Sequence, residues 1–197
     1  MESSTVIKPE HGTGQKEFIF TQEHEDLRAS MEDWVKKELH PHRNEWEDTK
    51  WPDSAIQRAG ELGYLGLCFP EEYGGQGGDY YYSLVRAEAL SYAGSGGLGM
   101  GFAVQTDVVL PPVHLLGTEE QKQKYLVPGI QGTKIGALGI TEPGAGSDVA
   151  GIRTTAILDG DEYVINGSKT FITNAARADF MVLVVKTDPS KAHDGIT

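Results

Sequence analysis

The sequence has 197 residues, which is enough for one large domain or two small ones with a hydrophobic core of their own. Its hydrophobic fraction of 39% argues against intrinsic disorder, and 29 acidic against 17 basic residues give a net charge of −12 at pH 7, which argues against nucleic acid as a partner. One cysteine, Cys68, excludes an intrachain disulfide, and no apolar run approaches the roughly 20 residues of a membrane-spanning helix.

Residues 1–20 are expected to form an N-terminal arm, with no apolar stretch that would mark a secretory or transit signal. Residues 21–134 are expected to form a helical domain, because five stretches place apolar side chains every three to four positions. These stretches span residues 21–39, 53–62, 79–93, 100–116 and 118–127.

Proline, glycine and capping residues suggest where these helices begin and end. Pro41 is expected to end the first helix, Gly63 the second and Pro128 the fifth. The proline pair at 111–112 should kink or split the fourth. Residues 118–121 read Thr-Glu-Glu-Gln, a capping box that opens the fifth helix.

After residue 134 the period of the hydrophobic pattern changes to two, which predicts a β-domain over residues 135–197. The pair Asn166-Gly167 favours a type I′ hairpin turn between two of its strands. The last four residues resemble the start of another strand, so the β-domain is expected to be incomplete. The predicted fold class is therefore α+β, with an all-α domain followed by an incomplete antiparallel β-domain. The expected strands span residues 135–140, 153–158, 162–165, 169–173 and 180–186.

Several residues that could suggest chemistry have a simpler interpretation. Residues 94–99 fit the dinucleotide-binding pattern GxGxxG, but a helical stretch and not a strand precedes them, so we expect a loop between helices. His40 and His42 have no partners at metal-ligand spacing and are expected to be helix-end histidines, so no metal site is predicted. Cys68 stands in an apolar run and is expected to be a small core residue.

The glycine-rich segment at residues 138–148 carries more information. Gly144 and Gly146 would let backbone N–H groups converge, and Ser147 would add a hydroxyl donor. Such a loop can hold a pyrophosphate without a basic patch, although the same residues can also form a plain turn. Both interpretations stay open on spacing alone.

The segments ITEPGAGSD (140–148), GIRT (151–154) and INGSKTFITN (165–174) strongly resemble the acyl-CoA dehydrogenase family of flavoproteins. The resemblance extends back through residues 117–122 and 70–75, in the right order. It covers nearly all of the chain after the N-terminal arm. It implies a helical domain, a middle β-domain and a C-terminal helical domain, with FAD held between the last two.

Carried over by position, the resemblance assigns eight residues to FAD. Leu138, Ile140 and Thr141 would line the flavin ring, with the hydroxyl of Thr141 near its pyrimidine edge. Gly146 and Ser147 would meet the pyrophosphate, and Ser147 would also approach the pantetheine arm of an acyl-CoA. Phe171, Ile172 and Thr173 would form the opposite wall, with the Thr173 hydroxyl facing flavin N5. Since Phe171 and Thr173 are two residues apart on an expected strand, both side chains should point to one face of that strand. The eight are Leu138, Ile140, Thr141, Gly146, Ser147, Phe171, Ile172 and Thr173.

The resemblance implies α,β-dehydrogenation of acyl-CoA thioesters, a step of fatty acid β-oxidation, with electron-transfer flavoprotein as the acceptor. Phe171, where the family often has Trp, favours a longer acyl chain. The family's base is a glutamate beyond residue 197, so we name no catalytic residue, and Glu142 is expected to be structural. The C-terminal helices that complete the flavin site and the family's homotetramer are absent as well.

The chain alone is therefore expected to be a truncated and inactive form of the enzyme. The alternatives are a noncatalytic binding module derived from the family and a domain that has lost FAD. The expected compartment is the cytoplasm of a bacterium, or the mitochondrial matrix if the chain is processed.

Overall fold

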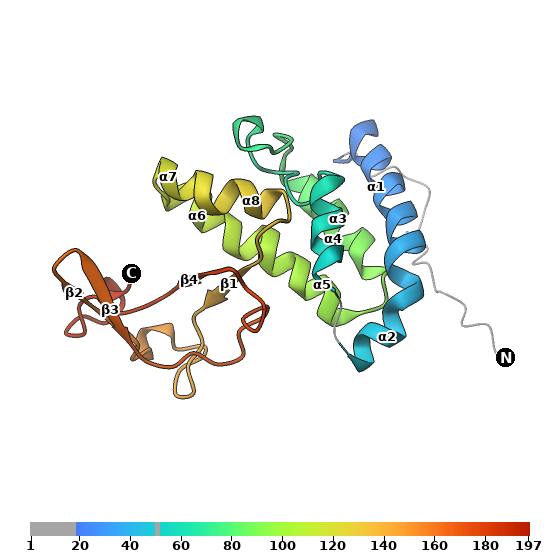
Figure 1. The fold of residues 1–197 in the computed structure, drawn as a ribbon. Coiled ribbons are helices and arrows are strands. Elements are labelled where there is room, and N and C mark those ends of the chain that lie inside the picture. The colour runs from blue at the N-terminus through green and yellow to red at the C-terminus, as the bar shows by residue number, and fades with distance from the viewer. Residues whose placement is uncertain (1–18, 50–51) are drawn as a thin grey trace.

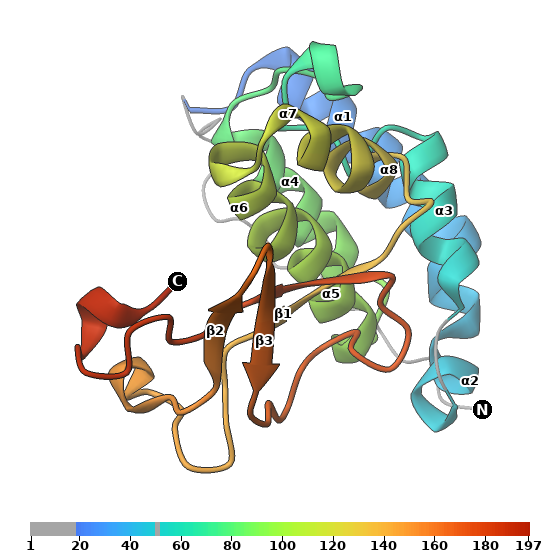
Figure 2. The same cartoon turned by 60° about the vertical axis from the view of Figure 1, so that its left-hand side comes forward.

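The computed structural model describes residues 19–49 and 52–197, so most of the predicted N-terminal arm lies outside the described residues (Figure 1). The helices form one part of the molecule, and the strands lie together beside it, at the lower left in Figure 1 and below the helices in Figure 2. This order of helices followed by strands confirms the predicted α+β class.

Across the described ranges the chain forms eight α-helices, several of them joined end to end by turns of π-helix or 3-10 helix. None of these helices is both long and apolar enough to cross a membrane. They are α1 (Gln22–Trp34), α2 (Arg43–Asp48), α3 (Asp53–Glu61), α4 (Tyr80–Ser91), α5 (Gly96–Ala103), α6 (Leu110–Leu116), α7 (Glu119–Gln121) and α8 (Val127–Ile130).

Two prolines that were expected to end helices do not do so. After α1 the chain continues through a π-turn (Val35–Leu39) and a 3-10 turn (His40–His42) into α2, and Pro41 lies inside that 3-10 turn. Pro128 lies in the first turn of α8. A proline is tolerated there, because the N–H it lacks would have no partner in the first turn of a helix.

Other predicted helix boundaries are confirmed. Gly63 follows α3 with a φ of +79°, the left-handed conformation of a C-terminal glycine. The capping box before α7 forms as predicted: the Thr118 N–H donates to Gln121 Oε1 over 2.9 Å, and the Gln121 N–H donates to Thr118 Oγ1 over 3.3 Å. At α4 the Asp79 carboxylate accepts the Tyr81 N–H over 2.9 Å.

The glycine-rich segment at residues 94–99 was expected to be a loop, but most of it is helical. Ser95 caps α5, and residues 96–99 form its first turn. Helix α4 precedes this segment, which agrees with rejecting a Rossmann site. A π-turn (Val104–Val109) then joins α5 to α6, so the predicted split falls just before the proline pair at 111–112.

The helices enclose a hydrophobic core. One cluster lies between α1, α3, α4 and α5 and includes Met31, Leu65 and Phe102, and partly buried Cys68 packs against it as expected. A smaller cluster under α6 and α8 includes Leu110 and Leu126.

In the part of the chain that the structure describes, the strands form two pairs. In the first, β1 (Gly136–Gly139) runs parallel to β4 (Phe180–Leu183), with Gly136 opposite Phe180. In the second, β2 (Thr155–Asp159) runs antiparallel to β3 (Glu162–Asn166). The parallel pair corrects the expectation of a purely antiparallel domain, and it is possible because the long segment between β1 and β4 crosses over before it returns.

Two strand predictions were wrong. The hairpin turn is at Gly160, with a φ of +66°, and not at Asn166-Gly167, since Asn166 is the last residue of β3. Residues 169–173 do not form a strand, because Phe171 adopts a left-handed conformation with a φ of +56°.

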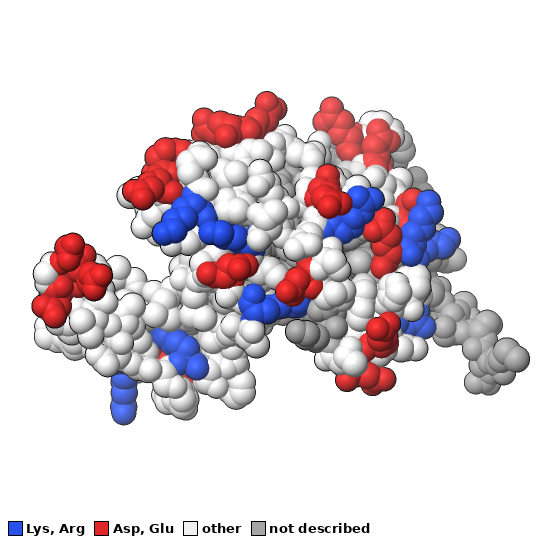
Figure 3. All heavy atoms as spheres, in the orientation of Figure 1, with Lys and Arg blue, Asp and Glu red and all other residues white. Residues whose placement is uncertain are grey.

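The hairpin of β2 and β3 leaves apolar side chains exposed on both of its faces, since residues adjacent in a strand point to opposite sides. In Figure 3 acidic side chains gather at the outer end of this part, and the surface beside them is mostly uncharged. The exposed apolar side chains belong to Ile157, Leu158, Tyr163, Val164 and Ile165.

Candidate cofactor site

Strand β1 leads directly into the glycine-rich loop. Residues 142–145 form a tight turn, in which the Glu142 N–H donates to Ala145 O over 2.9 Å and the Ala145 N–H donates back to Glu142 O over 3.2 Å. A β-carbon added to Gly144 or Gly146 would meet no atom within 4 Å. The protein's own packing therefore does not require glycine there, and its absence of a side chain leaves the backbone open to a ligand.

The residues after this turn present free hydrogen-bond donors. Within residues 19–49 and 52–197, the backbone N–H groups of Gly146, Ser147 and Asp148 form no hydrogen bond, and these three residues are exposed. Consecutive backbone N–H groups of this kind can bind an anion without adding charge to an acidic protein. The observation favours the pyrophosphate interpretation of the loop over a plain turn.

A buried carboxylate anchors the base of the loop. Glu142 is 8% exposed, and its Oε2 accepts the Arg153 N–H over 2.6 Å. Its Oε1 accepts the Thr154 N–H over 2.9 Å, the Thr154 hydroxyl over 2.6 Å and the Lys169 ammonium over 2.9 Å. Lys169 also donates to Ile140 O over 2.8 Å. These bonds join three segments that are separate in the sequence.

The same contacts set the ionisation of Glu142. Burial alone would raise the pKa of this carboxyl, but the hydrogen bonds from Thr154, from Lys169 and from the backbone N–H of Arg153 outweigh burial and lower its pKa to about 2. A carboxylate with so low a pKa is a poor general base near neutral pH. The contacts thus support the structural role expected for Glu142.

The second predicted wall lies beside the first. The Thr170 N–H donates to Thr141 O over 2.9 Å, so the segment at 169–173 runs next to the residues that follow β1. The Asn174 amide also donates to Gly101 O over 3.1 Å, which ties this segment to α5. The two groups of predicted flavin residues, far apart in the sequence, are therefore neighbours.

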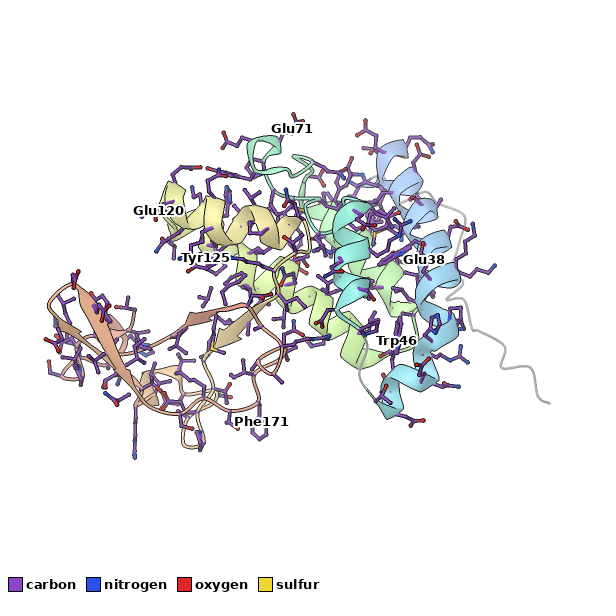
Figure 4. The ribbon with its side chains drawn as sticks, in the orientation of Figure 1. Glu38, Trp46, Glu71, Glu120, Tyr125 and Phe171 are labelled. Atoms are coloured by element: carbon purple, nitrogen blue, oxygen red, sulfur yellow. The ribbon has the colours of Figure 1, made fainter. Side chains whose placement is uncertain are left out.

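The orientation of Phe171 and Thr173 differs from the expectation. Because residues 169–173 are not a strand, the two side chains do not share a face through strand alternation. Phe171 is 92% exposed and projects away from the ribbon, as Figure 4 shows, while Ile172 and Thr173 are half-buried.

The remaining predicted residues lie at the end of β1 and on the loop that follows it. Leu138, Ile140 and Thr141 are half-buried at the end of β1, and Gly146 and Ser147 are exposed on the loop. An apolar surface with a hydroxyl, next to free N–H donors, fits a flavin ring joined to a diphosphate.

Sequence reasoning missed Thr154 and Lys169, which hold the Glu142 carboxylate. The one available signal was a lysine placed among apolar and hydroxyl residues in the same motif as Phe171.

A cavity of about 330 Å³ lies between α4 and α5. Its walls include the small residues Gly96, Gly99 and Ala103 and the apolar Leu90, and its lining also includes Arg86. Arg86 is buried and forms an ion pair with Asp107, at 2.5 Å between Nη2 and Oδ1. The cavity borders the same helix that the Asn174 amide contacts.

Two domain families match the chain. The N-terminal domain of acyl-CoA dehydrogenases matches residues 21–133, and the middle domain of the same enzymes matches residues 137–197. The probable acyl-CoA dehydrogenase YngJ of Bacillus subtilis is 42% identical over 175 residues, which are 88% of this chain and 46% of that protein. The chain therefore spans about half the length of such relatives.

Solved structures agree. The crystal structure of an acyl-CoA dehydrogenase from Geobacillus kaustophilus matches with a TM-score of 0.87 and 43% identity, over 91% of this chain and 48% of that one. An acyl-CoA dehydrogenase from Bacillus anthracis, crystallised in complex with FAD, matches with a TM-score of 0.81 and 38% identity, over 87% of this chain and 30% of that one.

Proposed function

Because this chain belongs to the acyl-CoA dehydrogenase family, we propose that it forms the helical and middle-domain part of an FAD-dependent enzyme that dehydrogenates acyl-CoA thioesters. The observation that carries the proposal is the loop with free N–H donors at residues 146–148, separated from the half-buried residues at the end of β1 by one tight turn. When bound, FAD supplies the hydride acceptor for such a reaction.

The chain's own residues bind and orient in this proposal. The N–H groups of Gly146 and Ser147 hold the pyrophosphate, and Leu138 and Ile140 support the flavin ring. The hydroxyl of Thr141 donates to the pyrimidine edge, where reduction places negative charge. Phe171, Ile172 and Thr173 form the second wall, and the Ser147 hydroxyl also meets the substrate's pantetheine arm.

FAD titration of the purified chain tests this proposal. Gly146→Val should weaken FAD binding at least tenfold with little loss of stability, because the new side chain occupies the open face of the loop where nothing else lies within 4 Å. Gly97→Val is the matched control, since Gly97 is also exposed with an open β-carbon position but lies on α5. Equal affinity in both variants, or no FAD binding by the wild type, would refute the proposed cofactor site.

The cavity between α4 and α5 bears on the acyl group. Its glycine and alanine walls suit an apolar chain, and together with Phe171 it favours a longer acyl substrate. Gly99→Leu would place a side chain in this space and should weaken binding of a long-chain acyl-CoA while leaving a short-chain one unaffected. Equal loss for both chain lengths would contradict this assignment.

Electron-transfer flavoprotein as acceptor, a role in fatty acid β-oxidation and a homo-oligomeric enzyme complete the proposal. No residue of this chain is assigned as the catalytic base. Flavin binding without acyl-CoA turnover is therefore the expected behaviour of the chain alone. The same behaviour would suit a noncatalytic binding module derived from the family. Anaerobic bleaching of bound flavin by acyl-CoA would contradict the expectation of inactivity.

A further inference from the structure

A buried ion pair lies at the point where the two walls of the proposed site meet. Lys169 Nζ is 2.9 Å from Glu142 Oε1, and the two side chains are 8% and 7% exposed. The residues are 27 positions apart in the sequence. One follows β1 at the base of the glycine-rich loop, and the other begins the segment that carries Phe171 and Thr173.

The pair reaches beyond its own two residues. Lys169 donates a second bond to Ile140 O over 2.8 Å, and the next residue, Thr170, donates its N–H to Thr141 O over 2.9 Å. On the other side, Glu142 accepts bonds from the segment that leads into β2. The ion pair therefore fixes the loop, the second wall and the start of the hairpin relative to one another.

The geometry also excludes a simpler role for Lys169. A lysine near a pyrophosphate loop could itself bind the phosphate, as lysines often do. Here the ammonium group is buried and already donates to a carboxylate and a carbonyl. Its charge offsets that of Glu142, and the loop's N–H groups remain the exposed donors.

We propose that Lys169 and Glu142 are positioning residues for the cofactor, because their ion pair holds the loop donors and the second wall at the spacing that FAD requires. This inference rests on the proposed function, since it concerns the affinity and environment of that cofactor. Removing one partner leaves a buried charge unpaired, which would displace the segments that the pair joins.

The test compares Lys169→Met, Lys169→Arg and the double variant Glu142→Gln/Lys169→Met with the wild type. Lys169→Met keeps an apolar stem and removes the positive charge of the pair, Lys169→Arg keeps a cation there, and the double variant removes both charges of the pair. Lys37→Met is the matched control, since Lys37 pairs with Asp33 at 2.7 Å on the exposed surface of the helical part.

Amide hydrogen exchange on the FAD-free proteins gives the first measurement. Lys169→Met should exchange at least tenfold faster at the N–H groups of Thr154 and Thr170, with no change in α1 to α6, and Lys37→Met should match the wild type. If Lys169→Met exchanges fast throughout the β part, the double variant replaces it, because it carries no unpaired charge. Unchanged exchange at Thr170 would overturn the proposal.

FAD titration with visible spectroscopy gives the second measurement. Lys169→Met should bind FAD at least tenfold more weakly than the wild type, and the absorption bands of its bound flavin should shift. In Lys169→Arg the affinity and the spectrum should return toward those of the wild type. Faster exchange with unchanged FAD affinity and spectrum would show a purely structural role and overturn the positioning role alone. Failure of the wild type to bind FAD would refute the proposed function and the positioning role with it.

Discussion

Replacing Glu142 by glutamine should change how the protein's stability depends on pH. The pKa of this carboxyl is about 2 in the folded protein and 4.5 in the reference state. A carboxyl group whose pKa is lowered on folding stabilises the folded protein at pH values above its unfolded-state pKa. This stabilisation is lost as the pH falls from about 4.5 toward 2. The difference between the two pKa values corresponds to about 3 kcal/mol, similar to the roughly 3–5 kcal/mol measured when one partner of a buried ion pair is removed.

Urea unfolding followed by far-UV circular dichroism can measure this effect, because urea does not screen charges. At pH 7 Glu142→Gln should unfold with a free energy about 3 kcal/mol lower than that of the wild type, and the difference should shrink steadily below pH 4.5. Glu162→Gln is the control, since Glu162 is exposed on β3 and its replacement should change stability by less than about 0.5 kcal/mol. A difference between Glu142→Gln and the wild type that stays constant down to pH 2.5 would refute the reasoning.

Three further substitutions test other parts of the structure, and urea unfolding measures the stability of each. Gly60→Ala should destabilise the protein by at least about 1–3 kcal/mol, because a β-carbon there would lie 2.1 Å from the backbone oxygen of Gln131; wild-type stability would contradict this contact. Thr118→Ala should cost about 1 kcal/mol through the lost helix cap, and Thr118→Ser should restore most of it. Phe171→Ala should change stability by less than about 0.5 kcal/mol, since the ring is 92% exposed, yet weaken FAD binding several-fold; unchanged affinity would remove Phe171 from the proposed site.

The sequence patterns predicted the helices well because helical periodicity and capping are local properties. Gly63 and Thr118 are where their chemistry indicates. The prediction that Pro41 and Pro128 end helices was wrong for a local reason too. Both residues lie in the first turns of new helical segments, a position where proline is tolerated. The pattern alone could not distinguish the end of one helix from the start of the next.

The β part was less predictable, because long-range contacts decide it. Asn166-Gly167 looked like a hairpin turn, but glycine is needed at 167 for a different reason: a β-carbon there would lie 2.2 Å from Thr154 Oγ1. Lys169 was expected in a strand but lies outside one, and its ammonium group pairs with Glu142, a partner that no local pattern identifies. The resemblance to a family indicated the candidate site residues, and the contacts between their segments became visible only in three dimensions.

The exposed hairpin also affects how the isolated chain behaves in solution. Its apolar side chains, including those of Ile157, Leu158 and Tyr163, favour contact between molecules, whereas the net charge of −12 makes the molecules repel one another. At 0.15 M salt the Debye length is about 8 Å, so added salt weakens the repulsion and leaves the apolar attraction intact. Colloidal stability should therefore be greatest in dilute buffer well above the isoelectric point of about 4.9.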